Sequence, residues 1–275
     1  AILLYTFQLY MDFAGCINIA RGSAQLFGIT LEENFKRPFF ATSVNEFWRR
    51  WHITLGAWFK DYIFYPISLG THFQKFSQNC RNHMNRYYAT TIPGIFALFA
   101  VWFGNGIWHG AEWKYIIYGL YYYVIMVLGM LLEPAFVSFC SKLNIDRNAS
   151  WYHTMQVVRT FILVNISWFF DRADTVGQAF HMMKLSVTKF APSQLLLIPA
   201  GKEGTAFTPY ALAILAAGCI ILFIVSVLQE RGMKIRESLA GLSLPITVAI
   251  YFCLLASIGF FGSTAVARGF IYAQF

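Results

Sequence analysis

Two histidines in this sequence directly follow a tryptophan, His52 after Trp51 and His109 after Trp108. The first pair lies in a basic, aromatic segment, and the second ends an uncharged apolar run. An imidazole at membrane depth is costly, which makes a functional role the default expectation. Histidine has an unperturbed pKa close to neutrality, so a buried histidine is suited to act as the general base that activates a hydroxyl. The two pairs therefore predict group transfer inside a membrane.

The segment around His52 alternates cations with indole rings over residues 47–62. A belt of tryptophan and arginine at a membrane boundary explains much of this pattern, because such residues anchor in lipid headgroups. Histidine is not typical of these belts, and the neighbouring cation of Arg50 is expected to hold the imidazole neutral, as a base requires. We therefore expect Trp51, Arg50 and Asp61 to bind substrate beside His52.

His109 follows a stretch that contains glycines and an asparagine, Gly104-Asn105-Gly106, and precedes Gly110. These residues predict that a transmembrane helix breaks where the histidine appears, and a broken backbone at membrane depth implies a cavity. Asn105 and Trp108 are then expected to contact the substrate, and Asn105 or nearby backbone amides could stabilise an oxyanion. The alternative is a helix end that emerges into the headgroups and leaves His109 merely solvated.

Two polar residues, Gln8 and Asp12, lie in the first apolar segment. Residues four apart share one face of a helix, and a carboxylate in the membrane must point into protein or water. We expect a structural role, as a hydrogen-bonded pair between helices or an ion pair with a basic residue of segment 36–60. No metal site is expected, because no set of histidines and cysteines has the spacing of zinc ligands.

The composition predicts a membrane protein that crosses the bilayer several times. Hydrophobic residues make up 57% of the 275 residues, charged residues make up 12%, and the mean hydropathy is +0.52. Residues 1–20 and 151–170, each interrupted by one charged residue, predict two spans, whereas 58–69 is too short to cross and predicts a re-entrant or interfacial piece. Four uncharged runs reach the length of about 18–20 residues that a spanning helix needs: Tyr87–Ala111, Tyr115–Leu132, Gly204–Gln229 and Ser238–Ala267. We therefore expect an all-α bundle of transmembrane helices.

Basic residues are unevenly distributed between alternate loops. The loops on one side carry 14 Lys and Arg residues and those on the other side carry six, so the positive-inside rule makes the first side cytoplasmic and leaves the C-terminus outside. This orientation inverts after residue 151 if segment 151–170 does not cross. The net charge of +8 requires no nucleic acid partner, because basic cytoplasmic loops facing anionic membrane lipid account for it. We expect one domain over 1–275, as the C-terminal portion of a longer protein, because residue 1 is not Met and opens an apolar helix pattern.

Together these motifs resemble the membrane-bound O-acyltransferase family, in its bacterial branch that acetylates polysaccharides or D-alanylates teichoic acid. The central motif, residues 46–62, is the most specific, and it is closer to the polysaccharide O-acetylating members. The motifs that carry the resemblance cover most of the chain: Gln8–Gly15, Glu33–Pro38, Glu46–Tyr62, Trp108–Tyr122, Trp168–Asp174 and Phe270–Phe275. Departures from the family pattern are Cys16 and Asn18, where relatives commonly carry Tyr and Asp, and Lys60 in place of an Arg.

The resemblance implies a bundle of about eleven spans in the full-length protein, with re-entrant or interfacial helices around a central pore. It implies His109 as the catalytic histidine and His52 as a second active-site histidine, in a multi-pass protein of the bacterial inner membrane. An acyl group, preferably acetyl, would pass from a cytoplasmic thioester on coenzyme A or an acyl carrier protein towards a polysaccharide outside, with no bound cofactor. D-alanyl transfer to teichoic acid stays open as an alternative, as does a transporter or channel in which the same polar residues line a path.

Tyr272 lies four residues from the apolar C-terminus, on the side that the charge count makes external. Its phenol could accept the acyl group and pass it to an accessory transferase outside the membrane. The alternative is an aromatic anchor at the outer interface, which tyrosine and phenylalanine favour. The Phe-Ile-Tyr-x-Gln-Phe pattern, residues 270–275, is shared with similar bacterial proteins, and anchoring alone would not require it.

Overall fold

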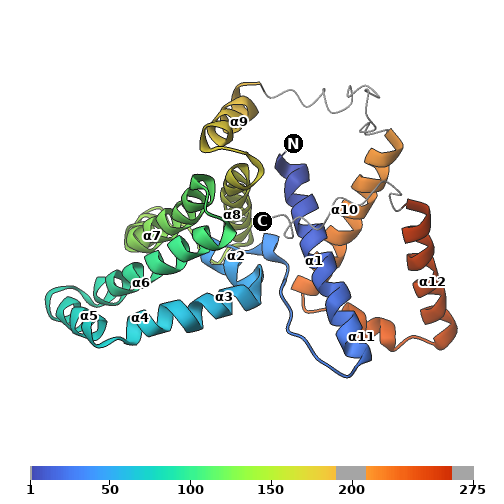
Figure 1. Cartoon of the computed structure of the whole chain (residues 1–275), viewed down its shortest axis with the longest axis horizontal. Helices are drawn as coiled ribbons and strands as arrows, with labels where there is room; N and C mark the ends of the chain where they lie inside the picture. The colour runs from blue at the N-terminus through green and yellow to red at the C-terminus, as the bar shows by residue number, and fades with distance from the viewer. Residues whose placement is uncertain (1, 190–208, 262–275) are drawn as a thin grey trace. The chain divides into compact units, whose positions relative to one another are not determined.

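The computed structural model describes residues 2–189 and 209–261, and the regular secondary structure in these ranges is helical, as predicted. The chain forms two compact units, one with the described residues up to 188 and one with residues 209–261. The first unit contains the helices coloured blue to yellow in Figure 1: α1 (Ile2–Leu26), η1 (Pro38–Phe40), α2 (Val44–Arg50), α3 (Ile53–Phe59), the π-helical turn η2 (Lys60–Phe64), α4 (Tyr65–Leu69), α5 (Thr71–His83), α6 (Arg86–His109), α7 (Trp113–Lys142), α8 (Ser150–Arg172) and α9 (Val176–Thr188). The second unit contains α10 (Pro209–Glu230), α11 (Ile235–Ala240) and α12 (Leu244–Phe261).

Four helices among the described residues are long and apolar enough to cross a membrane: α1, α6, α7 and residues 212–230 of α10. These helices confirm the first predicted span and three of the four uncharged runs as long apolar helices. The fourth run contains α12, which is apolar but shorter within the described residues. Segment 151–170 is helical within α8, but α8 is too polar to count among the helices that could cross a membrane.

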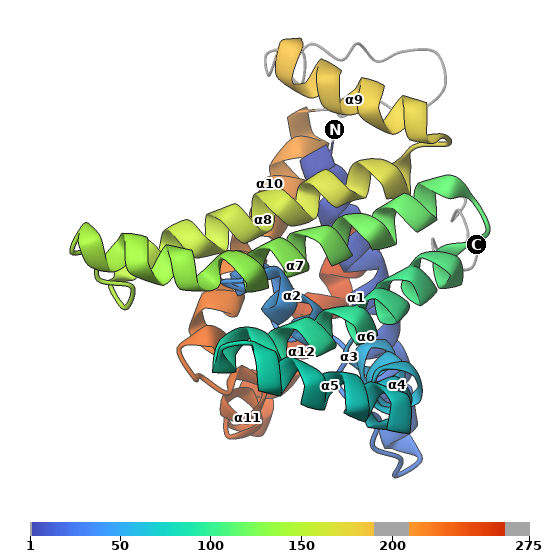
Figure 2. The ribbon, with the colours of Figure 1, turned by 90° about the vertical axis from the view of Figure 1, so that its left-hand side faces the viewer.

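Helices α6, α7 and α8 lie side by side, and α7 and α8 run antiparallel (Figure 2). Glycines let α6 and α7 approach closely: a Cβ on Gly106 would lie 2.7 Å from the Tyr115 carbonyl oxygen, and one on Gly119 would lie 2.2 Å from the Trp102 carbonyl oxygen. Helix α6 ends at the histidine, as predicted, although it continues through residues 104–106. Its C-cap is Gly110, which has a φ of 147°. Gly106 does not interrupt the helix, because it lets α6 and α7 come into close contact.

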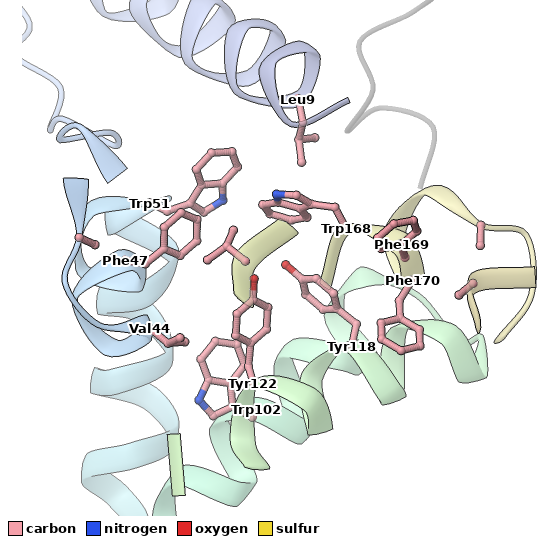
Figure 3. Packing of buried hydrophobic residues seen from close by; sticks show 14 of the residues in the cluster. Leu9, Val44, Phe47, Trp51, Trp102, Tyr118, Tyr122, Trp168, Phe169 and Phe170 are labelled. Carbon is pink, nitrogen blue, oxygen red and sulfur yellow. The ribbon is translucent and has the colours of Figure 1, made fainter. Parts of the chain in front are cut away.

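The core of the first unit is aromatic and is built by α1, α2, α6, α7 and α8 (Figure 3). Trp51 is 1% exposed and stacks on Phe47, with ring centroids 5.6 Å apart and planes 20° apart. Its ring centroid also lies 5.5 Å from that of Trp168 on α8. Such aromatic pairs contribute about 0.5–1.5 kcal/mol beyond the area that they bury. The core therefore ties the segment around residues 44–51 to the long helices.

We expect Gly119→Ala to destabilise the protein, because its added methyl group would overlap the Trp102 carbonyl oxygen on α6. Overpacking of this kind costs about 1–3 kcal/mol. The measurement is the temperature at which the detergent-solubilised protein loses its monodisperse peak in size-exclusion chromatography. Gly129→Ala on the same helix is the control, since nothing lies within 4 Å of its added Cβ. Equal melting temperatures for the two variants would contradict this account of the contact.

Candidate active site

His52 lies at the turn between α2 and α3 in the left-handed conformation, with φ 46° and ψ 54°. This conformation is uncommon for residues other than glycine, so the surrounding structure must hold it. The extended segment before η1 does so by pairing with the backbone on both sides of the histidine: Lys36 N donates to Arg50 O (2.9 Å), Ile53 N donates to Asn34 O (3.1 Å), and Phe35 and Trp51 form an isolated antiparallel bridge.

The side chain of Asn34 determines which nitrogen of His52 carries the proton. Asn34 Oδ1 accepts hydrogen bonds from the backbone N–H of Thr54 (3.3 Å) and from its hydroxyl (2.7 Å), so this atom is the amide oxygen. The same oxygen lies 3.1 Å from His52 Nδ1. Since an amide oxygen only accepts, Nδ1 donates, and the lone pair of a neutral imidazole is then on Nε2.

Burial lowers the pKa of His52 from 6.5 to about 4, so its imidazole is neutral at physiological pH. The neutral state was predicted, but the predicted cause, the cation of Arg50, is wrong. Arg50 forms an ion pair with Glu46 on the preceding turn, with Nη2 and Oε1 2.6 Å apart, and donates to Arg37 O (3.3 Å). The apolar surroundings of His52 include Phe13, whose ring meets the imidazole edge to face with centroids 4.7 Å apart.

His109 is the last residue of α6 and is 6% exposed, so the alternative of a solvated helix end is wrong. Two tyrosines of α7 enclose its ring. The centroid of Tyr118 lies 5.1 Å away in an edge-to-face arrangement, and that of Tyr115 lies 6.0 Å away in a stacked one. The close approach of α6 and α7 at Gly106 brings these rings to the histidine.

Trp108 joins the two histidines in space although they lie 57 positions apart in the sequence. Its ring centroid is 4.9 Å from that of His109 and 6.0 Å from that of His52, edge to face in both cases. Trp108 is 45% exposed, so one part of the indole faces away from the protein while its edges meet both imidazoles. The structure therefore brings His52, Trp108 and His109 into one cluster, which we call the histidine cluster.

Asn105 adds a polar atom to the same helix face as His109, since the two residues are four apart. The side chain is 4% exposed, and among the described residues its Oδ1 has no hydrogen-bond partner. A buried carbonyl oxygen without a partner costs about 1–3 kcal/mol, so this atom is suited to accept a hydrogen bond from a bound molecule.

Other predicted site residues lie elsewhere. Trp51 belongs to the hydrophobic core, and Asp61 is exposed in the η2 turn beside Lys60. Gln8 is exposed and Asp12 is half-buried. Gln8 lies about 200° round α1 from Thr6, which faces the core and donates to Asn165 Oδ1 (2.6 Å) on α8. Thr6 therefore supplies a hydrogen bond between α1 and α8, and the structural role expected of Gln8 and Asp12 stays a prediction. Tyr272 lies outside the described residues.

Several residues near the site have no strong signal in the sequence. Asn34 lies in the Glu33–Pro38 motif, but the spacing of the sequence does not predict its hydrogen bond to His52. Tyr5 donates to Asp171 Oδ2 (2.5 Å), and Lys114 Nζ donates to Ala173 O (3.1 Å), which joins the ends of α1, α7 and α8. No group of three or more histidine, cysteine, aspartate or glutamate residues in the described ranges could hold a metal ion.

Comparison with known proteins finds matches to one family of membrane enzymes. Residues 1–79 match the model of the membrane-bound O-acyltransferase family. The peptidoglycan O-acetyltransferase of Helicobacter pylori is 30% identical over 99% of this chain and 48% of its own length. These matches show that the chain is similar to the membrane-bound O-acyltransferases. The probable alginate O-acetylase of Pseudomonas putida is 34% identical over 66% of this chain and 31% of its own length. The teichoic acid D-alanyltransferase of Bacillus subtilis is 38% identical over 64% of this chain and 40% of its own length. The chain thus spans at most about half the length of these relatives, and the matches confirm the resemblance.

We expect stability to depend on pH through His52. Its pKa is about 4 in the folded protein and about 6.5 when unfolded, so the unfolded state binds more protons between these values. This contribution is fully present above pH 6.5 and is lost as the pH falls towards 4. His52→Gln should make the melting temperature fall less steeply over this window, whereas His153→Gln, at an exposed position, should leave the slope unchanged. Parallel curves for wild type and His52→Gln would contradict the burial of a neutral imidazole.

Proposed function

We propose that this protein transfers an acyl group, preferentially acetyl, from a cytoplasmic thioester to a polysaccharide or other polymer outside the bacterial inner membrane. The observation that carries this proposal is the histidine cluster, in which two enclosed imidazoles from distant segments meet on one exposed indole. Acyl transfer to a hydroxyl needs a base at the hydroxyl and a polar group at the carbonyl, within an environment that limits water. His109 of the cluster offers the base, and Asn105 on the same face of α6 offers a polar group.

In the proposed reaction His109 is the general base. The acceptor hydroxyl oxygen attacks the carbonyl carbon of the thioester while His109 takes the hydroxyl proton. The tetrahedral intermediate then collapses: the carbon–sulfur bond breaks, the new carbon–oxygen bond remains, and the proton on His109 passes to the departing thiolate. Enclosure by Tyr115, Tyr118 and Trp108 supports this role, because a base in an apolar site acts with little competition from water.

His52 orients the donor or the acceptor in this proposal. Its Nδ1 donates to Asn34, so Nε2 of the neutral ring is an acceptor for a hydroxyl or amide of a substrate. A neutral ring cannot stabilise an oxyanion as a cation would. The lowered pKa of His52 therefore favours hydrogen bonding to a substrate over stabilisation of an oxyanion. Asn105 and backbone amides remain the candidates for that second role.

The donor and acceptor are proposed by class. Acetyl-coenzyme A or an acyl carrier protein would supply the thioester, and an accessory transferase outside the membrane would complete the transfer. The relatives include proteins named for peptidoglycan O-acetylation and alginate O-acetylation, which supports acetyl transfer. D-alanyl transfer to teichoic acid is the second candidate, because the Bacillus subtilis relative named for it is 38% identical over 177 residues.

We expect His109→Ala to lower acyl transfer by about 10²–10⁴-fold, the usual contribution of a general base. The measurement is the amount of alkali-labile acyl ester on envelope polymers of cells whose only copy of the protein is the variant, normalised to the amount of protein in the membrane. His153→Ala is the matched control, since this histidine is exposed at the start of α8. Ester levels above a tenth of the wild-type level for His109→Ala would contradict the assignment of His109 as the general base.

Tyr272→Phe distinguishes an acyl relay from direct transfer. The change removes one oxygen and keeps the aromatic surface, so an anchoring role predicts normal ester levels, whereas a relay through the phenol predicts their loss. The intact mass of the C-terminal peptide, after incubation with acetyl-coenzyme A or acyl carrier protein thioesters, should show the acyl adduct in wild type and not in the variant. Normal ester levels with Tyr272→Phe would leave direct transfer as the mechanism.

A further inference from the structure

A cavity of about 1050 Å³ lies on the first unit and contains none of the candidate site residues. It is lined by the first half of α6, the second half of α7, the first half of α8 and residues 42–45. Several of its lining side chains are exposed, among them Leu132 (46%) and Met155 (46%), so the cavity opens to the surface as a groove. We call it the α7–α8 groove.

Two hydrogen bonds between helices show which residues lie at the same depth along the groove. Tyr87 Oη donates to Met130 O (2.7 Å), and Tyr121 Oη donates to Leu163 O (2.7 Å). Tyr87 is the second residue of α6, so the level of Met130 corresponds to the end of a predicted span, where lipid headgroups lie. Along α7, Met130 therefore lies at the headgroup level, and Tyr121 lies deeper in the membrane.

The walls of the groove are apolar on the interior side of this level, and the charges lie towards the headgroups. Leu98, Ile125 and Met126 line the interior part. Gly94 widens this interior part and Gly129 widens the groove near the headgroup level, because a Cβ added to either glycine would meet nothing within 4 Å. An apolar channel of this kind fits a hydrocarbon chain, which gains from burial along its length.

Arg159 is the charged residue nearest this apolar part. It lies four residues, or about 6 Å of helix rise, from Leu163 towards the headgroup level. Its Nη2 donates to Thr42 O (2.8 Å), and among the described residues it forms no ion pair. A guanidinium has five N–H donors, so most of this group's hydrogen-bonding capacity is available to an anion. An exposed arginine on a helix of a membrane protein is costly without such a partner.

The other charges of the groove leave it with a net positive charge. Arg147 forms an ion pair with Glu133, with Nη2 and Oε1 2.7 Å apart, so these two residues compensate each other. Arg159 then supplies the excess charge among the groove's lining residues. Thr42, Ser43 and Gln156 add polar groups around it.

We propose that the α7–α8 groove binds an anionic phospholipid, with its phosphate on Arg159 and one acyl chain along Gly94 and Leu98. Basic pockets between transmembrane helices are a known mode of binding anionic headgroups. One uncompensated cation lies between the headgroup level and an apolar channel that continues towards the interior, and this order matches the two chemical parts of such a lipid. This site is independent of the acyl chemistry proposed for the histidine cluster, because it lies at the opposite end of α6 from His109.

Native mass spectrometry of the full chain, purified in detergent and titrated with phosphatidylglycerol or phosphatidylcholine, tests the proposal. We expect wild type to retain one phosphatidylglycerol at concentrations where phosphatidylcholine is lost. Gly94→Leu should lower this retention at least fivefold, because its side chain fills the channel without a clash. Gly22→Leu on α1, which also has open space and lies outside the groove, should retain the lipid as wild type does.

Arg159→Gln separates the headgroup from the chain. This variant keeps the groove open and should bind the two lipids equally, whereas Arg49→Gln, at an exposed arginine outside the groove, should keep the preference. Unchanged retention of phosphatidylglycerol by folded Gly94→Leu, or an unchanged preference in Arg159→Gln, would overturn the proposal. If Gly94→Leu fails to fold, Arg159→Gln remains decisive.

Discussion

The close approach of α6 to α7 is the constraint on which the site depends. Gly106 and Gly119 leave no room for a side chain between the two backbones, so the helices meet at van der Waals distance over the last turns of α6. This contact brings Tyr115 and Tyr118 against His109 and closes that end of the site. A larger residue at either glycine would push α7 away and expose the imidazole.

A second contact, between the segment before η1 and the turn around His52, supplies the other half of the site. The backbone pairing of residues 34–36 with 50–53 holds His52 in a left-handed conformation, and Trp51 fixes this pairing in the core. The same arrangement buries the imidazole and selects its tautomer through Asn34. Position, protonation and tautomer of His52 thus have one physical origin, the packing of an aromatic core around Trp51.

Polar groups at membrane depth have different partners in different parts of the first unit. Thr6 and Asn165 satisfy each other inside the core, and Tyr5 and Asp171 do so near the ends of their helices. Asn105 Oδ1 and the guanidinium of Arg159 depart from this pattern, one in the candidate active site and one in the α7–α8 groove. Both residues lie where the proposals place a bound molecule.

The sequence by itself determined the all-helical class, three uncharged runs that form long apolar helices, and the pairing of tryptophan with histidine at 51–52 and 108–109. These features depend on local composition and periodicity, which the sequence displays directly. It did not determine whether Gly104 and Gly106 break a helix or pack one, since the same residue serves both purposes. Nor could it show that Thr6 rather than Gln8 faces α8, or that burial rather than Arg50 keeps His52 neutral. Those outcomes depend on which helix faces meet, and only the tertiary structure decides that, because burial and partners come from segments distant in the sequence.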